Sequence, residues 1–340
     1  MPDSSVGLLI LIITLAIGFG LVNGFNDAAN AIATVIGTKV LSPRKAIIMA
    51  AVLNMAGAAT GLAVAQTIGK GILTEEVMAQ YHYVPLIAAL ASVIIWAVVA
   101  THYGLPVSIS HSFIAGLAAA GMAVAGVRAV LWGIMERVLA AVITAPVLGF
   151  IGGFALMVVL FWIFHRTAPA RVRVITSNLQ ILSAAFMAYS HGKNDGQMPI
   201  GVITMALVIY YQQPSLWDEL PFGDLWWVVV ISALAISLGT AMGGWRVIKT
   251  LGLRVTALQP VHGFAAEASA ASVIELASHL GIPVSTTHCI SSSIMGVGST
   301  RRFSAVRWGI AGNIITAWVL TFPICGGLGY LFAWLLKPIF

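Results

Sequence analysis

The chain has 340 residues, of which 59% are hydrophobic and 8% are charged. A soluble domain carries about 25% charged residues, so this composition excludes a soluble protein and indicates an integral membrane protein. The formal net charge of +6 does not indicate a nucleic-acid partner, because the basic residues lie in short clusters between apolar runs, as membrane orientation requires.

Several apolar runs approach the length of about 20 residues that crosses a bilayer. In chain order they lie near 7–37, 46–66, 85–103, 106–125, 138–163, 175–211, 225–245, 256–280, 283–298 and 308–335. They predict an all-α integral membrane protein with about ten transmembrane or re-entrant segments. Runs 7–37 and 175–211 are too long for one span, so we predict broken helices there. Runs 106–125 and 283–298 begin with Pro and are rich in Ser, Thr and Gly, and they are either single spans or re-entrant hairpins.

Two polar strings occur twice inside these apolar runs. One is NGFNDAAN at 23–30 and HGKNDGQ at 191–197, and the other is PVSISHS at 106–112 and PVSTTHC at 283–289. The two copies of each string lie at similar offsets, which indicates a duplicated unit. Carboxylates and amides are costly to keep inside hydrophobic segments, so the strings predict a polar site built from both halves.

The loop charges predict that the two halves are inverted relative to each other. The loop after the first NGFNDAAN string is basic (Lys39, Arg44, Lys45), whereas the corresponding loop of the second half is acidic (Asp218, Glu219, Asp224). Because basic loops stay cytoplasmic, we predict a first repeat over 1–164, a short cytoplasmic linker over 165–174 and a second, inverted repeat over 175–340. Both termini are then extracytoplasmic.

The Asn-Asp strings predict a cation-binding or coupling site. Carboxylates, amides and carbonyls freed at a helix break are the oxygen ligands that a hard cation such as sodium requires. Alternatively, each Asp carries a proton. The alternative for a single copy is an ordinary polar helix cap near the membrane surface. The candidate coupling residues are Asn26, Asp27, Asn30, Asn194, Asp195 and Glu267, with Asp27 and Asp195 as the sodium ligands if sodium is the coupling ion.

The Pro-Val-Ser strings predict an anion site. Pro at a helix start leaves first-turn N–H groups free, nearby hydroxyls add donors, and the helix dipole favours negative charge, so such an N-terminus suits a tetrahedral oxyanion. The alternative is that these small residues only cap and pack helices. For His111 and His288, likewise, the alternative to anion binding is a structural role. The candidate phosphate-binding residues are Ser108, Ser110, His111, Ser112, Ser285, Thr286, Thr287 and His288.

Three further sequence features bear on function. The Ser-x-x-His spacing does not indicate a hydrolase, because no acid nearby orients the histidine and no Gly-x-Ser-x-Gly elbow exists. Glu267 lies among alanines, where a carboxylate needs water, a cation, a proton or an interhelical hydrogen bond. Lys193 could extend to the membrane surface, neutralise Asp195 or contact the anion.

The paired strings resemble those of the PiT family of inorganic phosphate transporters. GFNDAANAIATVIGT resembles the family's GANDVANA-type signature, SHGKNDGQMPIG resembles its repeat, and PVSTTHCISSSIMGVG closely matches its C-terminal signature. The resemblance covers nearly the whole chain and implies an inverted-repeat transporter, often dimeric, that carries phosphate with sodium or protons and needs no cofactor.

The chain departs from this family at a few positions. Phe25 and Lys193 replace small residues, and Met198 stands where an Asn would parallel Asn30. Asn54 lies near the position of a glutamate in the sodium-coupled animal members, whereas Glu267 matches a family glutamate. These differences leave open whether sodium or a proton is the coupling ion.

The sequence thus predicts a cell-membrane transporter, not an enzyme, that imports inorganic phosphate by cation symport through alternating access. Moving a dianion toward a negative interior costs about 2.3 kcal/mol per charge per 100 mV, and cations bound by the aspartates would offset that charge. The expected partners are phosphate, sodium or a proton, the lipid bilayer and a second copy of the chain. A transporter of sulfate or another oxyanion is the main alternative, and an ion channel is a weaker one.

Overall fold

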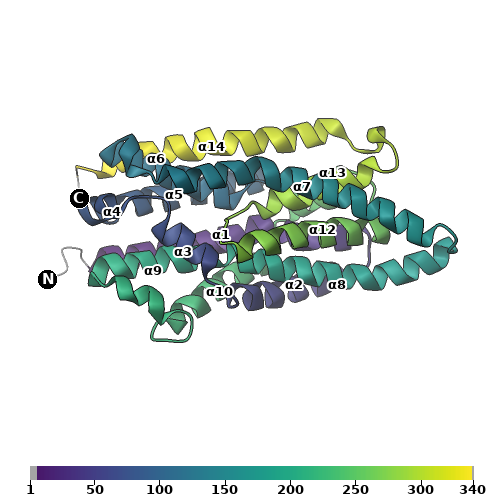
Figure 1. Ribbon diagram of the computed structural model, residues 1–340, viewed down its shortest axis with the longest axis horizontal. Helices are drawn as coiled ribbons and strands as arrows, with labels where there is room; N and C mark the ends of the chain where they lie inside the picture. Colours follow the sequence, from purple (N-terminus) through teal and green to yellow (C-terminus); the bar gives the residue numbers. More distant parts are fainter. Residues whose placement is uncertain (1–5, 339–340) are drawn as a thin grey trace.

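The computed structural model describes residues 6–338, and these residues form helices joined by short loops (Figure 1). The helices of the first half are α1 (Val6–Gly37), α2 (Pro43–Ala58), α3 (Ala63–Lys70), α4 (Glu75–Tyr81), α5 (Val84–Tyr103), α6 (Ile109–Ala125), η1 (Val127–Ala129) and α7 (Trp132–Phe164). Those of the second half are α8 (Pro169–Asp195), α9 (Gln197–Tyr211), η2 (Pro214–Glu219), α10 (Trp226–Met242), α11 (Trp245–Lys249), η3 (Thr250–Arg254), α12 (Pro260–His279), α13 (Thr286–Ser299), η4 (Phe303–Ala305) and α14 (Trp308–Leu336). Every predicted apolar run contains a helix, so the prediction of an all-helical membrane protein is confirmed.

Several helices are suited to a bilayer by length and composition. Among the described residues, α1, α5, α7 and α14 are long and apolar enough to span it, and two bent pairs raise the number to as many as six. These pairs are α2 with α3, bent by 68°, and α10 with the α11–η3 segment, bent by 60°. Large apolar side chains on α7 and α14, such as Trp162 and Val319, are exposed, as expected for a surface that faces lipid.

The prediction of a break in run 7–37 is wrong, because α1 is a continuous helix of 32 residues. Asn26, Asn30 and Thr34 donate to partners on neighbouring helices without any unwinding of the backbone; Asn26, for example, donates to the Thr101 hydroxyl at 2.7 Å. Gly24 also lets α10 approach closely, since a Cβ there would overlap the carbonyl of Ile236. Run 175–211 is interrupted as predicted, between Asp195 at the end of α8 and Gln197 at the start of α9.

Helices α5 and α6 form one hairpin, and α12 and α13 form another. Each turn begins with a glycine at positive φ, Gly104 at 71° and Gly281 at 67°, a conformation that a side chain would strain. The residues at the hairpin tips, including Val107 and Val284, are buried. Both Pro-Val-Ser strings therefore lie at turns inside the protein, and runs 106–125 and 283–298 contain the second arms of these hairpins.

The long helices of each half pack against the hairpin of the other half. Helix α14 packs along α6 and α7 packs along α13, while α1 packs on α10 and α2 packs on α8. Figure 1 shows α1 and α7 running in the opposite direction to α8 and α14. The packing of each half on the hairpin of the other half, together with these opposite directions, supports an inverted duplication. The boundaries 1–164 and 175–340 of its two repeats stay a prediction.

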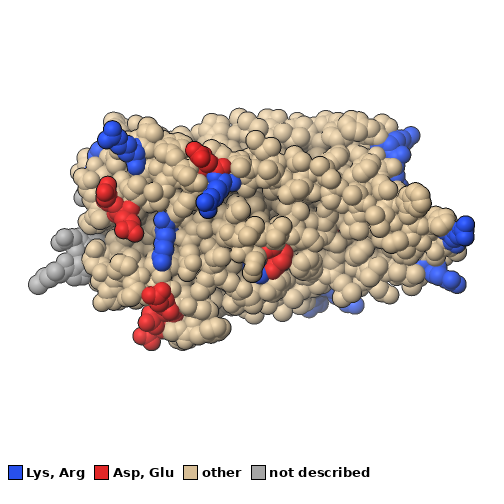
Figure 2. Space-filling model, viewed as in Figure 1, with Lys and Arg blue, Asp and Glu red and all other residues tan. Residues whose placement is uncertain are grey.

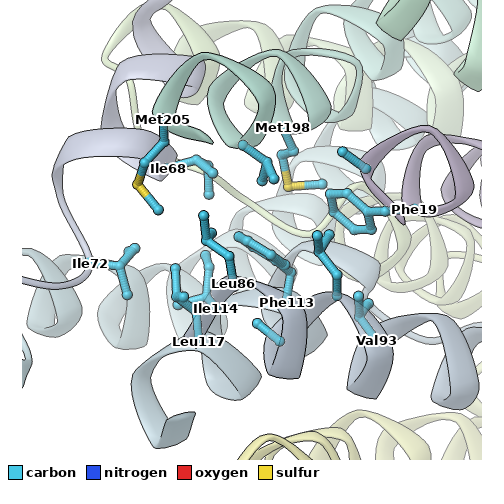
Figure 3. Packing of buried hydrophobic residues seen from close by; sticks show 14 of the residues in the cluster. Phe19, Ile68, Ile72, Leu86, Val93, Phe113, Ile114, Leu117, Met198 and Met205 are labelled. Carbon is cyan, nitrogen blue, oxygen red and sulfur yellow. The ribbon is translucent and has the colours of Figure 1, made fainter. Parts of the chain in front are cut away.

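Two clusters of buried apolar side chains hold the hairpins in place. One surrounds the first hairpin, where Phe19 of α1 and Phe113 of α6 stack with ring centroids 5.1 Å apart. Met198 belongs to this cluster and lies beside Phe19 in Figure 3. The other cluster joins α12 and α13 to α1, α7 and α8. Both hairpin tips are therefore fixed by packed helices, which keeps the polar residues between them in a defined arrangement.

Candidate functional site

Two aspartates and a histidine meet in the interior of the protein. Asp27 comes from the middle of α1, and His191 and Asp195 lie one turn apart at the end of α8. His191 Nε2 is 3.2 Å from Asp195 Oδ2 and 3.9 Å from Asp27 Oδ2. All three side chains are buried, and one ligand atom from each lies within 4.8 Å of the others. The group could therefore hold a small cation.

Hydroxyl groups from both hairpin tips donate to these carboxylates. Ser110 of the first hairpin donates to Asp195 Oδ1 at 2.9 Å, and Thr286 of the second donates to Asp195 Oδ2 at 2.8 Å. Thr287 donates to Asp27 Oδ1 at 3.1 Å. The predicted union of the Asn-Asp and Pro-Val-Ser strings is thus visible at these five residues.

The two tips also contact each other directly. The Thr287 hydroxyl also lies 3.0 Å from the carbonyl oxygen of Val107, and the Ser110 hydroxyl lies 3.4 Å from the carbonyl oxygen of Val284. Asn30 joins the group from α1, because its amide donates to the hydroxyls of Thr286 and Thr287 at 3.1 and 2.9 Å. The centre is therefore enclosed by both halves of the chain.

Ser108 and Ser285, two of the predicted phosphate ligands, are helix caps in this structure. The hydroxyls of Ser108 and Ser285 accept from the backbone N–H groups of His111 and His288, at 3.2 and 3.1 Å, so they cap α6 and α13. Ser112 donates to a carbonyl of its own helix at 2.6 Å. These three residues shape the hairpin tips, and their side chains make no hydrogen bond to the aspartates in the part of the chain that the structure describes.

The two predicted histidine ligands pack among aromatic rings. The rings of His111 and His288 lie 5.1 Å apart, centroid to centroid. His111 stacks on Phe322 at 5.7 Å, and His288 lies 4.1 Å from Trp318. Both aromatic partners belong to α14, so the geometry favours the structural alternative for this pair.

The two asparagines that precede the aspartates brace the hairpins. Asn26 is bonded to Thr101, near the end of α5, whereas Asn194 donates to the carbonyl of Val284 at 2.8 Å. Asn194 also donates to Asp195 Oδ1 at 2.8 Å. Each asparagine thus ties one Asn-Asp string to one hairpin, and Asn194 in addition fixes a carboxylate.

His191 is the central residue that the sequence reasoning did not single out. Its Nδ1 lies 2.8 Å from Asn54 Oδ1, and the amide of Asn54 donates to Thr240 at 2.8 Å, which orients that amide. The available signal was its spacing, because residues four apart in a helix share one face. His191 and Asp195 stand in this relation.

Glu267 lies in a second polar group and makes no hydrogen bond to the two aspartates within the described residues. Its carboxylate accepts from the hydroxyls of Thr34 and Ser183 and from the amide of Gln180, the last at 3.2 Å. All four side chains are buried. A buried carboxylate surrounded by oxygen-bearing side chains is suited to a cation or a proton, and it has interhelical hydrogen bonds as well.

Lys193 points to a partner outside the central group. Its ammonium forms an ion pair with Glu275 of α12. The two side chains retain 15% and 29% exposure, so the pair is partly solvated. The neighbouring Gln197 accepts from the N–H groups of Val64 and Ala65 at the start of α3, at 3.0 and 3.2 Å.

The fold and this centre define a class of protein. Apolar helices enclose a buried group of carboxylates and hydroxyls, and two helical hairpins meet there from opposite halves. Binding at the interface of two repeats, on discontinuous helices, is typical of secondary transporters.

Comparison with known proteins identifies the family. Residues 23–329 match the "Phosphate transporter family". A "Probable low-affinity inorganic phosphate transporter" of Bacillus subtilis is 40% identical over 333 residues, with 98% of each chain covered. A protein of the same name from Rhizobium meliloti is 41% identical over 319 residues, which cover 93% of this chain and 92% of that one. The solved structure "The sodium-dependent phosphate transporter" superposes with a TM-score of 0.88 at 25% identity, over 98% of this chain and 100% of that chain.

The chain therefore belongs to the phosphate transporter family, as its motifs predict. It is a multi-pass membrane protein, and the prediction of a transporter rather than an enzyme is confirmed.

Proposed function

We propose that this protein imports inorganic phosphate by symport with sodium or a proton, through alternating access. The observation that carries the proposal is the meeting of Asp27 and Asp195 with the hydroxyls of both hairpin tips. A site with carboxylates on one side and hydroxyl donors on the other can take a cation and an oxyanion together.

The coupling cation binds between the aspartates. Two buried carboxylates repel each other unless positive charge lies between them, and His191 provides some of it only when protonated. Sodium would use the oxygens of Asp27, Asp195 and Thr287, and the similarity to a solved sodium-dependent phosphate transporter supports sodium. Glu267 is a second coupling site, supported by its buried oxygen-bearing neighbours.

Phosphate binds at the hairpin tips, beside the cation. A cation on the carboxylates competes for the oxygens that now accept from Ser110, Thr286 and Thr287, so these hydroxyls become free to donate to phosphate. The first turns of α6 and α13 add backbone N–H groups and the positive ends of two helix dipoles. The residues predicted for phosphate binding thus divide into donors and the capping serines that hold the turns.

The proposed orientation follows from the charges at the two ends of the molecule. Helix α1 begins and α14 ends at the same end, on the left in Figure 1. In Figure 2 only Lys and Arg are visible at the opposite end, whereas the acidic residues lie toward the left and the centre. The positive-inside rule assigns the basic end to the cytoplasm and both termini to the outside. A homodimer in the cell membrane is proposed from the family resemblance.

Sulfate is the second candidate substrate. Phosphate as HPO₄²⁻ carries a proton that a carboxylate can accept, whereas sulfate offers only acceptors. The closeness of Asp27 and Asp195 to the hydroxyl donors therefore favours phosphate.

Competition in proteoliposomes tests this proposal. Purified protein is reconstituted, labelled phosphate is supplied outside under an inward sodium gradient or an inward proton gradient, and unlabelled phosphate or sulfate is added in excess. The proposal predicts uptake that phosphate abolishes and that equal sulfate leaves nearly intact. No uptake under either gradient, or equal inhibition by sulfate, would refute phosphate specificity.

A further inference from the structure

A cavity of about 710 Å³ lies at the basic end of the protein. It is bounded by the end of α1, the end of α7 and the starts of α8 and α12. Its walls include Thr38, Arg173, Thr176 and Gln259 together with apolar side chains. The cavity is large enough to hold water and ions, and Thr38 is the wall residue that connects it to the interior.

A buried polar row runs along α1 from the central site to this cavity. Asn30 and Thr34 follow Asp27 at steps of three and four residues, so they share one face of α1, and Thr38 comes directly after the end of this helix, four residues beyond Thr34. All four are buried. The row passes Glu267, which accepts a hydrogen bond from Thr34.

Gln180 of α8 closes the last step of this row. Thr38 donates to Gln180 Oε1 at 2.8 Å, and Gln180 Nε2 donates to Glu267 Oε1 at 3.2 Å. The Gln180 side chain is fully buried. One amide therefore separates the Glu267 carboxylate from the residue that faces the cavity.

Gly263 makes room for this amide. A Cβ at Gly263 would overlap the side-chain amide of Gln180, so Gln180 rests against bare backbone of α12. The gap between α1, α8 and α12 is thus filled by the Gln180 side chain rather than by packed backbone.

We propose that Gln180 is the inner barrier on the route by which the coupling cation leaves toward the cavity. This inference rests on the proposed symport function. The cation moves from the aspartates to Glu267, and it passes to the cavity when Gln180 swings off Gly263 and its bond to Thr38 breaks. The amide oxygen can coordinate the cation during that step.

The chemistry of the row fits a cation better than phosphate. Every step offers an oxygen, and the Glu267 carboxylate repels an anion of the charge of phosphate. Arg173 on the cavity wall gives that space positive charge, so a cation that has passed Gln180 is not held there. Phosphate then leaves the hairpin tips separately from the cation.

Two transport modes in proteoliposomes separate this role from a structural one. Net phosphate uptake under a cation gradient requires the cation to be released inside at every cycle. Exchange of labelled for unlabelled phosphate, with equal cation on both sides, does not require it. A barrier on the cation route therefore affects net uptake and spares exchange.

The variants are Gln180→Leu, which keeps the volume but removes the oxygen, and Thr38→Val, with Thr38→Ser as the conservative rescue. Thr176→Val is the matched control, because Thr176 lines the same cavity but, among residues 6–338, its hydroxyl bonds only to carbonyls of its own helix. We expect Gln180→Leu to lower net uptake by about tenfold, the effect of losing one polar partner in a dry site, and to change exchange less than about twofold. Thr38→Val should show the same selective loss in smaller measure, and Thr38→Ser and Thr176→Val should behave as wild type.

Equal losses of exchange and net uptake in Gln180→Leu would overturn the inference, and so would unchanged net uptake in this variant. A loss of net uptake in Thr176→Val equal to that in Thr38→Val would overturn it as well. Retained exchange also shows that the variant is folded. If the wild-type protein moves no phosphate in either mode, the proposed function fails, whereas an active wild type with unselective variants refutes only the role of Gln180.

Discussion

Replacing Asp195 by Asn changes one charge at the centre of the site with little change in shape. Asp195 is fully buried and accepts hydrogen bonds from Ser110, Thr286 and Asn194. An asparagine keeps one acceptor oxygen, but its NH₂ group then faces a hydroxyl or amide that formerly donated. The site also loses one of the two carboxylates proposed to hold the cation.

The magnitude follows from these contacts. A hydrogen bond to a charged group contributes about 1.5–3 kcal/mol, and at least one such bond is lost. Since each 1.4 kcal/mol corresponds to about a factor of ten, this loss alone corresponds to about a 10- to 100-fold effect, and the missing charge adds to it. We therefore expect coupled phosphate uptake to fall by about 100-fold or more. Folding should suffer less, because removing one of two adjacent buried charges also removes a desolvation cost.

The assay is initial-rate uptake of labelled phosphate by reconstituted Asp195→Asn, beside its thermal unfolding midpoint in detergent. Asp224→Asn is the matched control, because Asp224 is an exposed acid in the loop before α10. The control should transport as wild type does. Near-normal, cation-dependent uptake by folded Asp195→Asn would refute the assignment of Asp195 to the coupling site. A loss of uptake that is matched by a loss of folded protein would refute the expected separation of function from stability.

Three further experiments test separate parts of the structure. Lys193→Met and Glu275→Gln should show a coupling free energy of about 0.2–1 kcal/mol in a double-mutant cycle of thermal stability, and additive effects would contradict the ion pair. Gly24→Ala should strongly lower the yield of folded protein, because the added Cβ would overlap α10. Gly312→Ala is the control and should keep the yield, because a Cβ at Gly312 meets open space. Equal yields would argue against the close α1–α10 contact. Ser108→Ala should lower the free energy of unfolding by about 0.5–2 kcal/mol through loss of a helix cap. Phosphate affinity in binding assays should stay within about threefold of wild type, and a large loss of affinity would show that Ser108 binds phosphate.

Part of the fold and of the site could be predicted from the sequence because the cost of polar groups in a membrane leaves a visible pattern. The apolar runs located the helices, and the duplicated strings located Asp27, Asp195 and the hydroxyls of Ser110, Thr286 and Thr287. Each of these residues had to face a polar partner, and the other kind of string provided one: the Asn-Asp strings supply the acceptors and the Pro-Val-Ser strings supply the donors.

The remaining features depend on three-dimensional packing that residue types do not encode. His111 and His288 lie in the same strings as the hydroxyls, yet their helix face turns them toward aromatic rings of α14. Helix α1 stays continuous at Asn26, whose amide donates to a distant partner, Thr101, across the helix interface. The mismatch between Asn30 and Met198 has a packing explanation, because Met198 fills the apolar cluster beside Phe19 whereas Asn30 contacts the site.

Accumulation of phosphate against its own gradient is the measurement that tests the central claim most directly. Proteoliposomes are loaded with phosphate at the external concentration, and an inward sodium or proton gradient is imposed. The account predicts that internal phosphate rises above external phosphate, and that an ionophore for the driving cation abolishes the rise. Phosphate that only equilibrates across the membrane, with no response to either gradient, would contradict coupling through Asp27 and Asp195.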